Sequence, residues 1–386
     1  MPDLTLNAVD VLPEGRLAQQ LAGDRPLRVK LGIDPTTADI HLGHTVVLEK
    51  LAAFQREGHT VVLIIGDFTA RVGDPSGRSS TRPLPSPEEI EANAATYQEQ
   101  AFKLLDRERT EVRRNSEWLN MEPQALLGLL AQTTVARLLE RDDFQKRLKA
   151  NQPIAALELL YPLLQGYDSV AIEADLELGG TDQKFNLLFG RDLQSSYGQT
   201  PQSIMTMPIL VGTDGERKMS KSLGNYVGVT DPPEEMFGKL MSIPDKAMDE
   251  YFRLLLGTET PAGPPNEAKR ELGRRIVDRF HGEGSGARAE RAFNQVFVDR
   301  GVPEEIEELA LEAGNGEGGA VALPQLIGAG FGLSSSEARR LIKQGGVKLD
   351  GEPVAVDVLE MPREQLIGRV LQVGKRRFVR LVGAAE

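Results

Sequence analysis

The chain has only four histidines, and two of them, His41 and His44, stand three residues apart in the stretch "IHLGHTVVLEK". A zinc pair on a helix needs i, i+4 spacing and a third ligand, and the glutamate of an H-E-x-x-H motif is absent. The two side chains could also be ordinary surface histidines at a turn. A third interpretation places both imidazoles at the start of a helix, where backbone N–H groups favour anions and Gly43 allows close approach to the backbone.

A second stretch, "DGERKMSKSLGN", carries two lysines three residues apart with small hydroxyl residues beside them. Lys218 and Lys221 can both reach one polyphosphate and stabilise the charge that grows as pyrophosphate leaves. The alternative is a solvated basic turn, but Met219 inside the stretch predicts a specific packing contact. This stretch therefore indicates phosphate chemistry.

The elements that must position these residues follow a strand–helix–strand order. The stretch "PLRVKLGID" predicts a buried strand that turns at Asp34, "HTVVLEKLAAFQREG" predicts a helix that ends at Gly58, and "HTVVLIIGD" predicts a strand buried on both faces. Such a βαβ unit requires a parallel sheet. In sheets of this kind ligands bind beyond the carboxyl ends of the strands, and both histidines follow such an end.

The same alternation continues along the first part of the chain. We expect a helix with Ser86 as its cap and Pro87 at its first position. Leucine-rich helices are expected over 122–140 and in "IAALELLYPLLQGYD", followed by a strand in "SVAIEADLELGG", a helix in "DQKFNLLFGRDLQSSYG" and a strand in "SIMTMPILV". These elements predict a Rossmann-like, doubly wound α/β domain with a helical insertion over residues 1–228.

Beyond residue 228 the alternation stops. Helical patterns predict a helical domain over 229–311, and a linker rich in Gly and Glu follows at 312–320. Residues 321–386 predict a small α+β domain, with a capped helix in "SSSEARRLIKQGG" and a hairpin around Asp350 and Gly351.

Composition limits the chemistry that the chain can perform. It has no cysteine, which excludes disulfides, iron–sulfur clusters and cysteine nucleophiles. We expect a cytoplasmic protein, because the N-terminus lacks a signal-peptide pattern and no apolar run approaches the ~18–20 residues of a membrane helix. The net charge is −12, yet residues 321–386 hold ten Lys and Arg against seven Asp and Glu, and a basic module on an acidic body is a cue for a nucleic-acid contact.

Together the two motifs form a pattern that neither gives alone. An H-x-G-H stretch in the first βα turn and a K-M-S-K-S loop late in the same domain make the signature of class I aminoacyl-tRNA synthetases. The chain resembles this family, and most closely its bacterial tyrosyl-tRNA synthetases, in "KLGIDPTTADIHLGH", "GDFTARVGDPSGRSSTR", "YPLLQGYDSV", "GGTDQKFN" and "KMSKS". The resemblance implies that a homodimer activates L-tyrosine with ATP and Mg²⁺ to tyrosyl-adenylate, and then transfers tyrosine to the 3′-terminal ribose of tRNA.

The resemblance also implies a role for each site residue. The catalytic residues would be His41, His44, Lys218, Lys221, Thr36, Arg78 and Arg82. Tyrosine would be bound by Asp74, Tyr161, Gln165, Asp168, Gln183 and Lys30, and ATP by Gly43, Gly180, Asp182, Lys221 and Asp34. No protein-bound structural metal is expected. Because the substrates supply their own nucleophiles, the protein needs only to position them and stabilise charge, and no G-x-S-x-G or P-loop motif is present.

The spacing of the tyrosine-binding residues has a physical consequence. Tyr161, Gln165 and Asp168 stand at i, i+4 and i+7, on one face of a helix. By resemblance the first two hold the amino group of tyrosine, and Asp168 accepts its phenolic hydroxyl. Bound phenylalanine would leave that carboxylate desolvated and unpaired.

Two positions depart from the family pattern. Lys30 stands where many members have a tyrosine that contacts the substrate hydroxyl, and Glu177 stands where others have glutamine. Lys30 either pairs with Asp168 or points away from it, and the sequence leaves this question open.

The C-terminal domain resembles the S4 RNA-binding domain. Its helix would present Arg339, Arg340 and Lys343 to an RNA backbone, with Lys348 nearby, although a solvated helix face is the plain alternative. Two other functions remain open, namely a tryptophanyl-tRNA synthetase of the same architecture and a non-catalytic RNA-binding relative. A carboxylate acceptor suits a phenol better than an indole, and both catalytic motifs are intact, so we predict the tyrosine enzyme.

Overall fold

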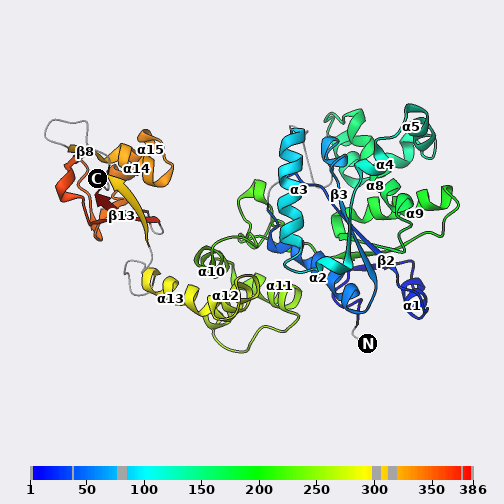
Figure 1. Cartoon of the computed structure of the whole chain (residues 1–386), viewed down its shortest axis with the longest axis horizontal. Helices are drawn as coiled ribbons and strands as arrows, with labels where there is room; N and C mark the ends of the chain where they lie inside the picture. Colours follow the sequence, from blue (N-terminus) through cyan, green and yellow to red (C-terminus); the bar gives the residue numbers. More distant parts are fainter. Residues whose placement is uncertain are drawn as a thin grey trace. The chain divides into compact units, whose positions relative to one another are not determined.

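The computed structural model describes residues 3–36, 39–75, 85–297, 306–311, 320–374 and 377–383. The chain divides into two compact units, Met1–Gly286 and Ala287–Glu386 (Figure 1). Within the described ranges, no helix is both long and apolar enough to cross a membrane.

The described part of the first unit is built around a six-stranded sheet in the order β1-β6-β5-β2-β3-β4. Its strands are β1 (Asp10–Leu12), β2 (Arg28–Ile33), β3 (Thr60–Ile65), β4 (Thr110–Arg114), β5 (Leu176–Gly180) and β6 (Ser203–Met207). All neighbours are parallel except β1 and β6. The chain proceeds outward from β2 to β4 on one side and from β5 to β6 on the other, so its direction across the sheet reverses between β2 and β5.

Helices connect these strands and extend beyond them. They are α1 (Arg16–Leu21), α2 (Leu42–Arg56), α3 (Pro87–Ala101), α4 (Ser116–Leu119), α5 (Pro123–Leu130), α6 (Val135–Leu138), α7 (Asp142–Lys149), α8 (Ala156–Ala171), α9 (Lys184–Ser196), α10 (Pro233–Met241), α11 (Met248–Tyr251) and α12 (Pro265–His281). The next helix, α13 (Ser285–Phe297), begins at the boundary and belongs mostly to the second unit. Helix α2 packs on β2, β3 and β5, while α9 packs on β5 and β6 and lies against α8 (Figure 1). A π-helical turn, Phe252–Leu256, follows α11.

The predicted α/β architecture is confirmed. The βαβ unit consists of β2, α2 and β3, and its two strands pair in parallel. The predicted cap of α3 is also present, because the Oγ of Ser86 accepts from the backbone N–H of Glu89 at 3.2 Å and the Glu89 carboxylate accepts from the N–H of Ser86 at 2.7 Å.

Two predicted elements need correction. The strand expected in "SVAIEADLELGG" is limited to β5, because its first residues complete α8. That helix ends before Glu173, whose φ of 52° reverses the chain toward β5. Residues 307–311, which the sequence places in the helical domain, instead form β7 (Glu307–Leu311) and pair in parallel with β13 (Arg377–Gly383) of the C-terminal sheet. Residues 312–319 of the predicted linker lie outside the described residues.

The described part of the second unit holds a five-stranded sheet, β10-β9-β12-β13-β7, and a two-stranded sheet, β11-β8. The remaining elements are β8 (Ala320–Ala322), α14 (Leu323–Phe331), α15 (Ser335–Lys343), β9 (Val347–Leu349), β10 (Glu352–Pro353), β11 (Glu360–Pro362) and β12 (Val370–Val373). The predicted hairpin turns at Asp350 and Gly351, which have φ of 49° and 86°.

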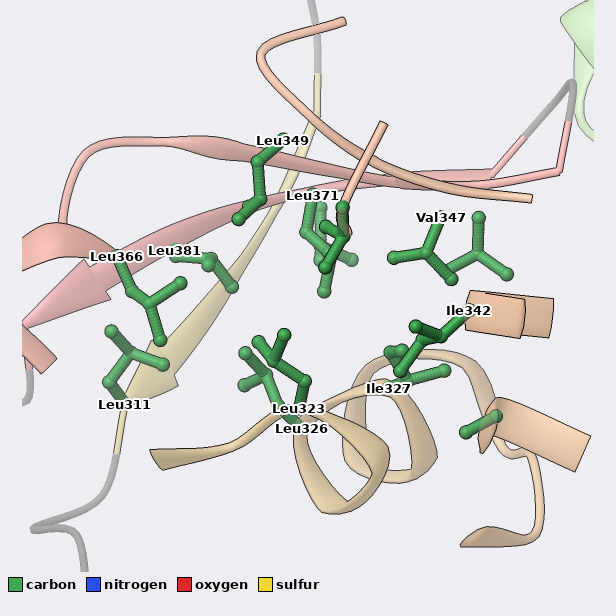
Figure 2. Packing of buried hydrophobic residues seen from close by; sticks show 14 residues of the cluster. Leu311, Leu323, Leu326, Ile327, Ile342, Val347, Leu349, Leu366, Leu371 and Leu381 are labelled. Carbon is green, nitrogen blue, oxygen red and sulfur yellow. The ribbon is translucent and has the colours of Figure 1, made fainter. Parts of the chain in front are cut away.

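The core of the second unit explains why β7 belongs to it. Figure 2 shows Leu323, Leu326 and Ile327 of α14 facing leucines of the large sheet, and Leu311 of β7 lies in the same cluster. Leu311 is only 1% exposed. The burial of this side chain gives β7 a place in the sheet that its short, acidic sequence does not reveal.

Candidate active site

A cleft of about 950 Å³ opens where the parallel strands β2 and β5 end. Strand β2 leads into Asp34, and β5 leads into Thr181–Gln183. Because the chain leaves these two strands in opposite directions across the sheet, their carboxyl ends form the kind of crevice in which doubly wound folds bind ligands.

His41 and His44 lie at the start of α2 in this cleft, with His41 as the N-cap residue. Their rings stack with centroids 3.8 Å apart, and the backbone N–H of His41 donates to Nδ1 of His44 at 3.2 Å. Gly43 lies between them, and a Cβ there would fit tightly, 3.0 Å from the His41 ring and 3.5 Å from Met219.

Both imidazoles are neutral near pH 7. Burial, followed by the nearby lysines Lys218 and Lys221, lowers the pKa of His44 to about 4. Burial, followed by the adjacent His44 and then the two lysines, holds the pKa of His41 well below its ordinary value. A neutral imidazole still has one N–H to donate, so the pair can hydrogen-bond a phosphate without adding charge.

The lysine loop lies beside the histidines. The backbone of Leu42 donates to the carbonyl of Val227 at 2.9 Å, and Val229 donates to the carbonyl of Ile40 at 3.0 Å. These bonds connect the start of α2 to the segment that follows the loop. Met219, only 4% exposed, anchors the loop as the sequence predicts.

Each loop lysine is paired with a carboxylate. The Nζ of Lys218 lies 3.3 Å from Oδ2 of Asp182, and the Nζ of Lys221 contacts Oδ2 of Asp39. Asn225 holds the loop backbone between them, because its Oδ1 accepts from the N–H of Ser220 at 2.8 Å.

A buried carboxylate lies deeper in the cleft. Asp168, 3% exposed, accepts from the indole Nε1 of Trp118 at 2.8 Å and from Nδ2 of Asn115 at 3.5 Å. Burial raises the pKa of Asp168 to about 7, although Lys30 and these two donors oppose the shift. The carboxyl group therefore gains stability from any further donor that favours its ionised form.

A second, half-buried carboxylate belongs to Asp34. It accepts from the hydroxyl of Thr69 at 2.6 Å and from the phenol of Tyr161 at 2.9 Å. Burial raises its pKa to about 7 as well. The absence of a side chain at Gly66 is required here, since a Cβ would lie 2.0 Å from Oδ1 of Asp34.

Amide side chains link the remaining predicted tyrosine contacts. Gln183 donates to Oδ2 of Asp74 at 2.8 Å. Asn186 donates to Oε1 of Gln183 at 3.0 Å and to Oε1 of Gln165 at 2.8 Å. Arg141, 3% exposed, donates to Oδ1 of Asn186 at 2.5 Å. These linked hydrogen bonds fix the orientation of the side-chain amides of Gln165, Gln183 and Asn186.

The structure brings most of the predicted site residues to one cleft. Its lining includes Asp34, Thr36, His41, Gly43, His44, Asp74, Tyr161, Gln165, Asp168, Gly180, Asp182, Gln183, Lys218 and Lys221. Lys30 is fully buried behind this lining and its ammonium group pairs with Glu177, so the structure gives it no direct access to the cleft. Arg78 and Arg82 lie outside the described residues.

The predicted RNA-binding residues lie in the second unit. Arg339, Arg340 and Lys343 are exposed on α15, and Lys348 is half-buried on β9. Their role stays a prediction.

Sequence reasoning missed several residues that hold the site together, among them Asp39, Asn115, Trp118, Arg141, Asn186 and Asn225. One signal was present in the sequence. Trp118 is the only tryptophan of the chain and follows the polar stretch "RRNSE", which begins in the last two residues of β4. A polar stretch at the carboxyl end of a strand in this fold faces the ligand crevice.

The site and fold agree with known proteins. The family model of class I tRNA synthetases (W and Y) matches residues 22–298, and the S4 domain model matches residues 323–356. The chain therefore belongs to the class I tRNA synthetases of the tryptophan and tyrosine group.

Within this group, the chain is similar to tyrosine enzymes. The chain is 50% identical to the tyrosine–tRNA ligase of Moorella thermoacetica, over 98% of this chain and 94% of that protein. It is 51% identical to the tyrosine–tRNA ligase of Thermotoga maritima, over 98% and 96%. Among solved structures, the tyrosyl-tRNA synthetase of Archaeoglobus fulgidus, complexed with L-tyrosine, is similar with a TM-score of 0.60, at 25% identity over 74% of this chain and 96% of that one.

Proposed function

We propose that this cleft binds tyrosine through Asp168, Gln165 and Asp74 and binds ATP between the histidine pair and the lysine loop. The activity is that of the tyrosine–tRNA ligases, to which the chain is about half identical over nearly its whole length. One observation carries the proposal. The cleft that holds the buried carboxylate of Asp168 is also lined by His41, His44 and both loop lysines.

The tyrosine phenol is proposed to donate its hydroxyl proton to a hydrogen bond with Asp168. Trp118 occupies Oδ1 of that carboxylate at 2.8 Å, while the Asn115 donor stands 3.5 Å from Oδ2 and leaves that oxygen more available. An acceptor in a buried slot discriminates against phenylalanine, because the carboxylate would lose water without gaining a donor. The ammonium group would then lie near Gln165 and Asp74.

Activation needs a carboxylate oxygen of tyrosine to attack the α-phosphorus of ATP. The bond from that phosphorus to its bridging oxygen breaks, and pyrophosphate leaves with the electron pair. We propose that His41 and His44 donate hydrogen bonds to the phosphates and that Lys218 and Lys221 stabilise the leaving charge. Thr36 would donate its hydroxyl to the γ-phosphate, while Arg78 and Arg82 stay predicted contacts outside the described residues.

ATP binding also explains how the loop lysines become available. Asp182 is proposed to accept a hydrogen bond from the ribose of ATP, which would release Lys218 from its present partner. Gly180 precedes it, and a Cβ there would lie 2.8 Å from Oδ1 of Asp182. Gly180 thus leaves room for a ligand beside that carboxylate, and Gly43 does so beside the histidines.

Mg²⁺ is proposed to arrive with the phosphates of ATP. The described residues contain no group of three or more His, Asp or Glu side chains placed to hold a metal ion. Asp39 and Asp182, the carboxylates beside the proposed phosphate site, are each paired with a loop lysine. A metal site made by the protein alone does not fit these residues.

We propose a homodimer that uses the helical insertion as its interface. Four large apolar side chains are exposed along this insertion, namely Leu127 (66%), Val135 (61%), Leu148 (49%) and Leu157 (42%). They come from four successive helices, α5 to α8, which makes the insertion our candidate for an interaction surface. A second copy of the chain is the partner that resemblance to the family favours.

The second step attaches tyrosine to tRNA. A ribose hydroxyl at the 3′ end of tRNA attacks the carbonyl carbon of the adenylate, and AMP leaves. We propose that α15 and β9 contact the tRNA backbone through Arg339, Arg340, Lys343 and Lys348, because exposed cations on one small domain suit a phosphate backbone. We place the enzyme in the cytoplasm, where a bacterial-type tRNA substrate is found.

ATP–pyrophosphate exchange with tyrosine, phenylalanine and tryptophan, each alone, tests this proposal. Exchange with tyrosine alone is the expected result. Exchange with tryptophan would change the assigned substrate from tyrosine to tryptophan. A folded protein that binds tRNA but shows no exchange would contradict the proposed enzymatic function. Asp168→Asn should lower kcat/KM for tyrosine about 100-fold through loss of a charged acceptor, while Asp175→Asn, at the opposite end of β5, should not.

A further inference from the structure

Two oppositely charged side chains are buried together behind the cleft. Lys30 of β2 and Glu177 of β5 are direct neighbours in the strand register, and they are 0% and 1% exposed. The Nζ of Lys30 lies 2.9 Å from Oε1 of Glu177. A buried ion pair rarely stabilises a fold more than apolar residues of the same size would, so its presence calls for a specific role.

Lys30 has no donor left for a substrate. Its ammonium group donates to Glu177, to the hydroxyl of Ser169 at 2.8 Å and to the main-chain carbonyl of Gln165 at 3.0 Å. A lysine ammonium has three N–H groups, and all three are used. The side chain is also absent from the cleft lining. Lys30 therefore acts on the cleft through its neighbours.

Glu177 determines how the side chain of Gln165 is turned. An ionised carboxylate can only accept hydrogen bonds, so the group of Gln165 that lies 3.2 Å from Oε1 of Glu177 must be its NH₂. The other oxygen of Glu177 is held by Ser169 at 3.0 Å and Gln202 at 2.5 Å. The carbonyl oxygen of Gln165 must then point away from Glu177. A glutamine at position 177 could present either end of its amide and would not fix this direction.

The carbonyl oxygen of Gln165 keeps one position for a ligand. It accepts from Nδ2 of Asn186 at 2.8 Å, and an amide oxygen has two lone pairs. Gln165 lines the cleft. We infer that Lys30 and Glu177 form a buried positioning pair that turns this oxygen toward the ammonium group of tyrosine. The inference rests on the proposed function, which places that ammonium group at Gln165.

The double variant Lys30→Met/Glu177→Gln tests the inference, because it removes both charges and leaves neither buried alone. Three probes are compared by calorimetry: L-tyrosine, tyramine, which keeps the ammonium group, and 3-(4-hydroxyphenyl)propionate, which lacks it. We expect the affinity for tyrosine and tyramine to fall about tenfold, the effect of a misplaced hydrogen bond to a charged group. The affinity for the propionate should stay within about twofold. The matched control is Arg28→Met/Glu111→Gln, which removes a half-exposed ion pair of the same sheet, 2.8 Å long, and should change none of the affinities.

The outcomes distinguish a failure of the proposed function from a failure of the Lys30–Glu177 positioning pair. If the unaltered protein does not bind tyrosine, the proposed function fails and the inference with it. If it binds tyrosine but the double variant binds all three probes as before, or loses all three equally, the inference alone is overturned. Where the double variant does not fold, Lys30→Gln/Glu177→Gln, which also removes both charges but keeps a polar group at each position, should show the same selective loss.

Discussion

The Nζ of Lys218 lies 3.3 Å from Oδ2 of Asp182, which joins the lysine loop to the turn after β5. Lys221 is paired in the same way with Asp39, just before α2. Among the described residues each lysine thus has one carboxylate partner, and a polyphosphate carries more negative charge than either of these carboxylates. Binding of ATP therefore favours transfer of both lysines from the protein to the phosphates.

Lys218→Ala should lower the rate of ATP–pyrophosphate exchange about 100-fold, which is the usual cost of one lost donor to developing charge. The KM for tyrosine should change little, because Lys218 acts on the leaving pyrophosphate. The control is Lys246→Ala, which removes an exposed lysine whose partner, Glu216, is also 3.3 Å away. Equal exchange rates in the two variants would contradict the role assigned to Lys218.

The stability of the protein should depend on pH through the histidine pair. Burial lowers the pKa of His44 from 6.5 to about 4. Between these values the unfolded chain binds more protons than the folded chain, so the folded state loses stability as the pH falls through this window. His44→Asn should flatten that slope by up to about 1.4 kcal/mol per pH unit. Urea unfolding over a series of pH values measures it. Above pH 7 the free energy of unfolding should depend on pH equally in the unaltered protein and in His44→Asn. If the variant has the same slope as the unaltered protein below pH 6.5, the prediction is refuted.

Much of this site could be predicted because its signals are local. The spacing of His41 and His44, the glycine between them and the βαβ pattern around them all fall within one short stretch. The same is true of the lysine loop with its buried Met219 and of the helical face that carries Tyr161, Gln165 and Asp168. Local spacing and periodicity fix which side chains share a turn or a face.

The rest depends on contacts between distant segments. Nothing near Lys30 in the sequence indicates that its partner is Glu177, because that pairing exists only once β5 lies beside β2. Trp118 likewise meets Asp168 across fifty residues of sequence. Strand β7 was missed because its five residues gain their place from β13, about seventy residues later in the chain. Pairing of this kind is set by tertiary packing and not by propensity.

The single tryptophan provides an optical probe of the tyrosine site. Trp118 is the only tryptophan in the chain, and its Nε1 donates to Asp168 at 2.8 Å. Because burial raises the pKa of Asp168 to about 7, indole fluorescence should titrate with a midpoint near that pH. Tyrosine binding should shift the midpoint downward, since a phenol donor favours the ionised carboxylate. Asp168→Asn should abolish the titration, whereas Asp175→Asn should retain it. A titration that survives in Asp168→Asn would assign it to another group, such as Asp34.

The C-terminal domain should affect charging of tRNA without affecting activation of tyrosine. Arg339 and Arg340 are exposed on α15 of the second unit, whereas the cleft belongs to the first. The double variant Arg339→Ala/Arg340→Ala should raise the KM for tRNA about tenfold and leave ATP–pyrophosphate exchange unchanged. Each lost phosphate contact should also reduce the slope of log affinity against log salt by about 0.7–0.9.

The salt dependence separates a direct contact from a general effect of charge. Arg25→Ala/Arg107→Ala changes the net charge equally, and both of its arginines are exposed ion-pair partners in the first unit. This control should leave the KM for tRNA and its salt slope close to those of the unaltered protein. If both double variants weaken tRNA binding alike, the overall charge is responsible and α15 has no specific role. If only the α15 variant shows a smaller slope of log affinity against log salt, Arg339 and Arg340 bind phosphates of the tRNA directly.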